Sequence, residues 1–186
     1  MGESAVGIIR ISGPGALAIA ARVLKTRAPI AGFPSHTLRR VTVVDPATGD
    51  QVDEALCAIM RAPRSYTGED VVELSCHGSP ALLRMVMRRL IAAGARLAEP
   101  GEFTRRAFVN GRLDLAQAEA VALLIGARTE RAVTLAARAL TGGLSARVRA
   151  QREELLDLLA GLEVTLDFPE EHAGTDVEKE IGRAHV

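Results

Sequence analysis

The sequence is poor in aromatic residues and in cysteine. Aromatic residues make up 3% of its 186 residues and tryptophan is absent, so a core has to be built from Ala, Leu, Val and Ile. Because 48% of the residues are hydrophobic, a packed core is expected and intrinsic disorder is not. The two cysteines, Cys57 and Cys76, lie outside any CxxC motif. Isolated cysteines of this kind indicate reduced thiols in the cytoplasm rather than a disulfide framework.

Long apolar runs and nucleotide-binding motifs are also missing. No run approaches the roughly 20 apolar residues of a transmembrane helix, and the first residues lack the pattern of a signal peptide. We therefore expect a soluble cytoplasmic protein with no membrane partner. The sequence contains neither GxxxxGK[ST] nor a GxGxxG after a predicted strand. It is thus not expected to cradle nucleotide phosphates as a P-loop protein does.

Charge is balanced overall but divided unevenly along the chain. Lys and Arg equal Asp and Glu at 23 each. Residues 1–152 nevertheless carry a net charge of +8, and residues 153–186 carry −8. Such a split indicates two structural units with different surroundings. It is weak evidence for nucleic-acid binding, because no dense basic run with interleaved aromatic residues accompanies it.

The first half predicts strands alternating with helices, the pattern of an α/β or α+β domain. β-branched runs bounded by Gly, Pro and Asp mark the strands, and apolar spacing with capping signals marks the helices. The predicted strands are residues 5–11, 37–44, 52–60 and 71–76, and the predicted helices are residues 15–24 and 80–93.

From residue 104 onward the pattern is helical. Asp114 is a predicted N-cap, and a longer helical stretch over about 129–166 is interrupted at Gly142-Gly143. The fold class is therefore α+β, with an α/β domain over 1–112 and the start of an all-α domain over 113–179. Residues 180–186 resemble a translated sequencing adapter and are expected to be a non-native tail. In the first helix after Asp114, five apolar residues are expected to lie on one face. They are Leu115, Ala118, Val121, Leu124 and Ile125.

Among the charged residues inside predicted strands, Arg10 and Glu73 are the two candidates for contact with a ligand. Arg10 interrupts an apolar run, so it must face solvent, pair with a partner or point at a ligand. Glu73 alternates with Val72 and Leu74 and should face outward. A guanidinium grips carboxylates or phosphates in a bidentate way, and a carboxylate accepts two N–H bonds from a guanidine-like edge. The plain alternative for Arg10 is a solvated position on an edge strand, and the plain alternative for Glu73 is an outward-facing carboxylate in solvent.

Metal and catalytic motifs are not evident. Cys76 and His77 are too few ligands for a structural zinc site, and no Ser-His-Asp arrangement can be assembled from the sequence. We therefore assign no catalytic residue and no metal ligand. Residues 99–115 crowd turn residues, arginines and two phenylalanines into one segment. A domain hinge with solvated arginines does not by itself explain that crowding.

Four segments together resemble the MnmE (TrmE) family of GTPases that modify the wobble uridine of tRNA. They occur in the family's order along nearly the whole chain, and the third combined with SYTGED is the most specific. The segments are GIIRISGP (7–14), SYTGEDVVEL with CHG (65–78), PGEFTRRAFVNGRLDLAQAEAV (100–121) and DFPEE (167–171).

The resemblance implies a tetrahydrofolate-binding-type domain that also forms a homodimer, followed by a helical domain into which a GTPase domain is inserted. The implied cofactor is 5-formyltetrahydrofolate or methylenetetrahydrofolate, held by Arg10, Glu73 and Arg112. Glu73 would read the pterin edge, and the two arginines would serve the carboxylate or formyl oxygen. Arg112 stands where the family commonly has Lys. The arginine keeps the positive charge, but its planar guanidinium changes the geometry of the contact.

For the full-length protein the resemblance implies GTP, Mg²⁺ and K⁺ as further cofactors. It also implies the partner MnmG (GidA) and tRNA, with 5-(carboxymethyl)aminomethyl modification of the wobble uridine as the reaction. This chain, without a GTPase domain, is expected to be an N-terminal fragment that has no catalytic activity alone.

Two other functions remain open. A stand-alone folate-dependent aminomethyltransferase would share the fold, but the motif around its catalytic Asp is not found. A non-enzymatic dimerisation or RNA-binding module would use the basic region for phosphate contacts. It would bind tRNA with a steep salt dependence and without folate.

Overall fold

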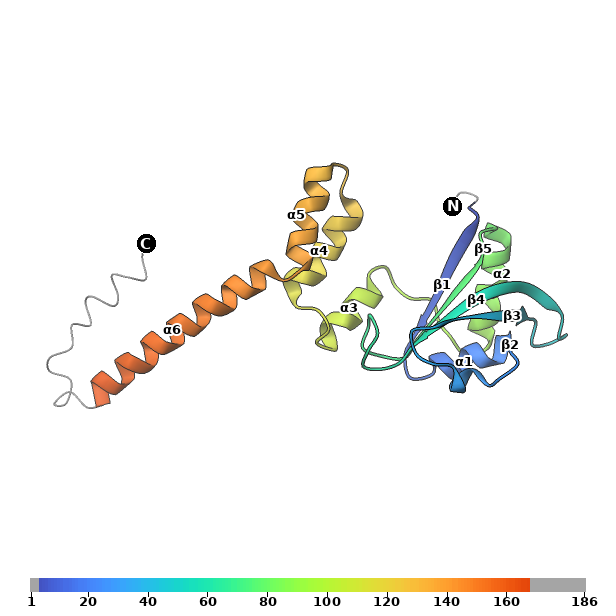
Figure 1. Cartoon of the computed structure of the whole chain (residues 1–186), viewed down its shortest axis with the longest axis horizontal. Helices are drawn as coiled ribbons and strands as arrows, with labels where there is room; N and C mark the ends of the chain where they lie inside the picture. The colour runs from blue at the N-terminus through green and yellow to red at the C-terminus, as the bar shows by residue number, and fades with distance from the viewer. Residues whose placement is uncertain (1–3, 168–186) are drawn as a thin grey trace.

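The computed structural model describes residues 4–167, which form a sheet domain followed by a series of helices (Figure 1). The sheet domain lies at one end of an elongated molecule, and the last helix projects away from it. This arrangement confirms the predicted α+β class. The expected non-native tail at 180–186 and residues 168–171 of the DFPEE motif lie outside the described residues.

Five strands form one antiparallel sheet in the order β1-β5-β4-β3-β2. The four predicted strands are all present. β2 was not predicted, because two residues are too few to show a period of two. The strands are β1 (Val6–Ser12), β2 (Leu24–Lys25), β3 (Leu38–Val44), β4 (Gln51–Met60) and β5 (Val71–His77).

Two helices, α1 (Ala16–Val23) and α2 (Pro80–Ala92), cover one face of the sheet. Inward-facing aliphatic side chains from alternate strand positions pack against them. Ser79 caps α2 and Pro80 follows at its first turn, where a missing N–H costs nothing. The buried side chains include Ile9, Val43, Ile59, Leu74 and Val86.

The other face of the sheet is open within the described residues. Its large apolar side chains Val6, Ile8, Leu38 and Leu56 are exposed. The register places Ile8, Ser75, Leu56 and Arg40 in one cross-strand row. The next row holds Arg10, Glu73, Ala58 and Leu38.

Helix α3 (Glu102–Val109) follows a turn in which Gly101 adopts a φ of 76°. The helical pattern predicted from residue 104 onward covers most of this helix, but its start at Glu102 and its end at Val109 were not predicted. The missed signal is the spacing of Glu102 and Arg106, which are four residues apart and paired on one side of the helix. A short 3-10 turn, η1 (Ile30–Gly32), was also not predicted.

Three helices follow: α4 (Leu115–Gly126), α5 (Glu130–Leu140) and α6 (Gly143–Asp167). Asp114 forms the predicted cap in a reciprocal capping box with Gln117, and Gly142, with a φ of 81°, separates α5 from α6. α4 and α5 lie side by side (Figure 1). The predicted apolar face of α4 is only partly covered, because Leu115 and Ile125 are exposed. Among the described residues, no helix is long and apolar enough to cross a membrane.

Candidate ligand-binding site

Arg10 and Glu73 face each other across the β1–β5 ladder on the open face of the sheet. Nε and Nη2 of Arg10 lie 2.8 and 2.7 Å from the same carboxylate oxygen, Oε2 of Glu73. Glu73 is flanked by the fully buried Val72 and Leu74, so the predicted outward orientation is confirmed. Within the described residues, Oε1 of Glu73 accepts no hydrogen bond. The pair therefore keeps one acceptor and one guanidinium edge free.

A hollow of about 460 Å³ lies along β1, the edge strand of the sheet, and Arg10 is one of its lining residues. Its walls come from β1, the C-terminal end of α2, residues 94–98 and α3. The ring of Phe103 lies 5.9 Å from the guanidinium carbon of Arg10, a distance at the limit of cation–π contact. Arg10 thus lies where the open sheet face meets this hollow, whereas Glu73 and Arg112 do not line it.

Arg112 is anchored to the loop of residues 61–70 and not to this pair. Its Nε donates to the carbonyl oxygen of Ser65 at 3.1 Å, and Asn110 donates to the carbonyl oxygen of Thr67 at 2.7 Å. Its terminal nitrogens make no hydrogen bond within the described residues. The structure therefore joins Arg10 to Glu73 and gives Arg112 a separate anchor.

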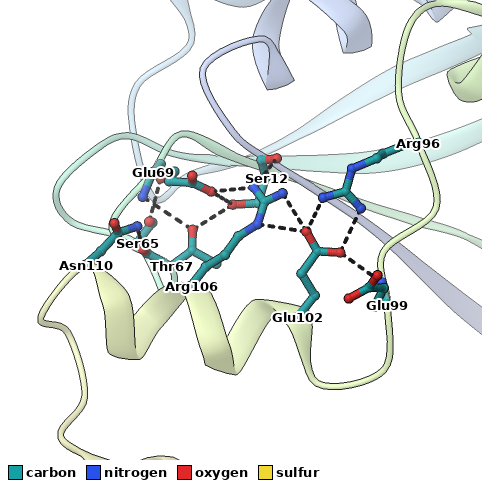
Figure 2. A network of polar contacts seen from close by, with 9 residues as sticks. All are labelled: Ser12, Ser65, Thr67, Glu69, Arg96, Glu99, Glu102, Arg106 and Asn110. Carbon is teal, nitrogen blue, oxygen red and sulfur yellow. Dashed lines mark hydrogen bonds and ion pairs between the residues drawn. The ribbon is translucent and has the colours of Figure 1, made fainter.

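A network of polar contacts connects α3 to the end of β1 and to the loop 61–70 (Figure 2). At the centre of the network lies Glu102, which is only 3% exposed. Arg96 binds both oxygens of this carboxylate, and Arg106 donates to Oε1 through Nε and Nη2 at 3.1 and 2.7 Å. The backbone N–H of Glu99 donates to Oε2 at 2.8 Å. A buried carboxylate with this many donors remains ionised.

These donors lower the pKa of Glu102 well below its usual value of 4.5. The hydrogen bonds from Arg96 are the largest cause, followed by the backbone N–H of Glu99 and by Arg106. Conversely, hydrogen bonds to Glu69 and Glu102 raise the pKa of Arg106. Glu102 and Arg106 are thus both charged at neutral pH.

Arg106 also reaches the opposite side of the network. Its Nη1 lies 2.9 Å from Oε2 of Glu69, and the same oxygen accepts the hydroxyl of Ser12 at 2.8 Å. The Ser12 hydroxyl lies 2.7 Å from that of the fully buried Thr67. Sequence reasoning missed these residues, because Ser12, Glu69 and Arg106 are brought together only by the tertiary fold.

His77, which the sequence analysis did not favour as a catalytic residue, is paired at the end of β5. Its Nδ1 lies 2.6 Å from Oδ1 of the buried Asp53, and its backbone N–H donates to Oδ2 of the same residue at 3.0 Å. Burial raises the pKa of the neighbouring Cys76 thiol to about 11, which leaves it a poor nucleophile at neutral pH. No group of three or more metal-ligating side chains occurs among residues 4–167.

Two family models match consecutive parts of the chain. The model described as GTP-binding protein TrmE N-terminus matches residues 1–112, and that of the MnmE helical domain matches residues 115–185.

Curated relatives with the name tRNA modification GTPase MnmE align over almost the whole chain. The protein of Symbiobacterium thermophilum is 50% identical over 182 residues, which cover 97% of this chain and 40% of the relative. The protein of Thermus thermophilus is 54% identical over 171 residues, with coverages of 92% and 39%. The chain thus spans about two fifths of the length of the curated relatives it matches.

Proposed function

This chain belongs to the MnmE family, and from that membership we propose that it binds a one-carbon tetrahydrofolate and dimerises as part of a tRNA modification enzyme. The observation that carries the proposal is the Arg10–Glu73 pair on the open sheet face. It presents a carboxylate and a guanidinium, both with unused hydrogen-bonding capacity, on a rigid pair of strands.

The chemistry of this pair fits a folate. The pterin ring carries a guanidine-like edge of N–H donors, and Oε1 of Glu73 is an acceptor with no partner in the described part of the chain. Arg10 already occupies Oε2 of Glu73, which holds the carboxylate in one orientation. Glu73 therefore reads the pterin edge, and the free edge of Arg10 serves a carboxylate or the formyl oxygen.

Arg112 supplies the second cation. Its Nε is committed to Ser65, so its planar terminal nitrogens are fixed in direction and available to an anion. The folate supplies the one-carbon unit when it is bound, and the residues of this chain hold and orient it. The one-carbon donor is 5-formyltetrahydrofolate or methylenetetrahydrofolate.

Dimerisation is proposed through the open face of the sheet. Val6, Ile8 and Leu56 form an exposed apolar centre. Ion pairs on the same face, Arg10–Glu73 and Arg40–Glu54, present both signs of charge. A two-fold interface requires a self-complementary surface, which an apolar centre with mixed charges provides.

The remaining steps belong to the full-length protein. Together with GTP, Mg²⁺, K⁺, tRNA and the partner MnmG, it would place a (carboxymethyl)aminomethyl group on carbon 5 of the wobble uridine. The basic region of this chain offers phosphate contacts for tRNA. This chain alone is expected to bind folate without hydrolysing GTP, and it is expected in the cytoplasm.

Calorimetric titration of 5-formyltetrahydrofolate into the purified chain tests the folate site. We expect saturable binding, weakened about 10- to 100-fold by Glu73→Ala because a hydrogen bond to a charged group is lost. Glu54→Ala is the matched control, since Glu54 pairs loosely with Arg40 on the same face at 3.8 Å and should leave the affinity unchanged. Equal affinities for all three proteins would reject the assigned site.

A further inference from the structure

Residues on and just after α3 hold the loop 61–70 from one side. Along the loop, from Ser65 to Glu69, the groups that are contacted alternate between backbone carbonyls and side chains, so the contacts fix both the position and the path of the loop. They are Arg106 with Glu69, Tyr66 with Thr104, Asn110 with the carbonyl of Thr67, and Arg112 with the carbonyl of Ser65.

The loop in turn fits closely against Arg112. Gly68 has a φ of 78°, and a Cβ atom added to it would lie 3.2 Å from Cγ of Arg112 and 3.3 Å from Cβ of Asn110. The glycine therefore allows the stem of Arg112 to lie directly against the loop backbone. A shift of the loop would move the carbonyl that anchors Arg112.

Arg106 connects the loop to the buried end of the network. The Arg106 side chain bridges two carboxylates, that of Glu102 on α3 and that of Glu69 on the loop. Its Nη1 also donates to the backbone carbonyl of Ser12 at 3.3 Å. Because Ser12 ends the strand that carries Arg10, the same guanidinium is connected to both cationic parts of the candidate site.

We propose that Glu102, Arg106 and Glu69 are positioning residues that set the place of Arg112 relative to the Arg10–Glu73 pair. The proposal rests on the assignment of Arg112 to the folate site. Of these three side chains only Glu102 is buried, whereas Arg106 and Glu69 are partly exposed. A partly exposed ion pair such as Arg106–Glu69 adds little to stability, so stability alone is a poor account of these charges. A defined geometry between two anion-binding arginines requires a directional connection. Arg106 supplies one, because it donates two charge-assisted hydrogen bonds to Oε1 of Glu102 and one to Oε2 of Glu69.

Hydrogen exchange at the side-chain Nε–H of Arg112 tests the connection without ligand. The signal is identified in nitrogen-edited NMR spectra by its loss in Arg112→Lys. We expect slow exchange in the unsubstituted chain and about tenfold faster exchange in Arg106→Met and Glu69→Gln, because the bond to Ser65 weakens. Arg105→Met is the matched control, since the neighbouring Arg105 side chain points outward to Glu99 at 3.7 Å.

Folate titration provides the functional readout through a double-mutant cycle. If Arg106 acts through Arg112, Arg106→Met combined with Arg112→Ala weakens binding no more than Arg112→Ala alone. A purely structural role would make the two losses multiply.

Unchanged exchange in both Arg106→Met and Glu69→Gln, or multiplying losses, would overturn the proposal. If Arg106→Met does not fold, the milder Glu69→Gln decides both measurements. A chain that binds no folate would reject the proposed function, while the exchange rates still decide whether Arg112 is positioned by this network.

Discussion

At the scale of single residues, Glu102 is the most constrained charge among the described residues. It is nearly inaccessible to solvent and accepts hydrogen bonds from Arg96, Arg106 and a backbone N–H. A lone buried carboxylate is costly, but removing one member of a paired cluster leaves an uncompensated charge. The main role of Glu102 is therefore to hold the side chains of Arg96 and Arg106 in place, and its own contribution to stability is secondary.

The pH dependence of stability should reveal this residue. Because the folded-state pKa of Glu102 is depressed below 4.5, its contribution is present above pH 4.5 and is lost as the pH falls below that value. Glu102→Gln should be less stable at pH 7 and should lose less stability between pH 5 and pH 3. Urea unfolding at both pH values measures this, and an identical pH dependence in the two proteins would contradict it.

At the scale of elements, the loop 61–70 depends on a glycine whose backbone other residues rarely adopt. Gly68 and Gly49 have nearly equal φ values, 78° and 79°, but only Gly68 is crowded, whereas Gly49 faces open space. Alanine at either position incurs the same left-handed backbone cost of about 1–2 kcal/mol. The pair therefore separates backbone strain from contact with Arg112.

We expect Gly68→Ala to destabilise the chain more than Gly49→Ala and to weaken folate binding by displacing Arg112. Gly49→Ala should lower the free energy of unfolding and leave the affinity unchanged. Chemical denaturation and calorimetric titration of both variants provide the comparison. Equal effects of the two substitutions on both quantities would show that the contact between Gly68 and Arg112 has no consequence.

Local signals were sufficient to predict most elements but not the polar network. The strands at 37–44 and 52–60 followed from β-branched runs and the turn between them, and the helix after Asp114 followed from its capping residue. The bounds of the helix over Glu102–Val109 were not predicted, because its Pro-Gly start and several charges outweighed its short apolar pattern. Its i,i+4 pair was the available signal.

The candidate site was only partly accessible to sequence reasoning. Arg10 and Glu73 stood out because a charge inside an apolar strand has few explanations, but their pairing depends on the β1–β5 register. Arg112 entered only through family resemblance. Arg96, Glu69 and Ser12 carried no local signal, since their partners lie far away in the sequence or on another element.

At the scale of the whole molecule, large apolar side chains are exposed both on the open sheet face and on α6. Ile8 on the open sheet face is 59% exposed, and α6 carries exposed leucines such as Leu155 and Leu159. A monomer rarely leaves several such patches uncovered. The sheet face combines its apolar centre with two ion pairs. This combination favours contact with a second copy of the chain at that face.

We expect Ile8→Lys to convert a dimer into a monomer, because it places like charges on both sides of a two-fold interface. Leu159→Lys on α6 is the control and should remain dimeric if the sheet is the interface. Sedimentation velocity over a range of concentrations measures the association. A dimer that persists in Ile8→Lys and dissociates in Leu159→Lys would assign the interface to the helices instead.

The most direct test of the folate site is a crystal structure of this chain grown with 5-formyltetrahydrofolate. We expect the pterin edge within hydrogen-bond distance of Oε1 of Glu73, with Arg10 and Arg112 contacting the carboxylate or formyl oxygens. A bound folate that contacts none of these three residues would reject the assigned site.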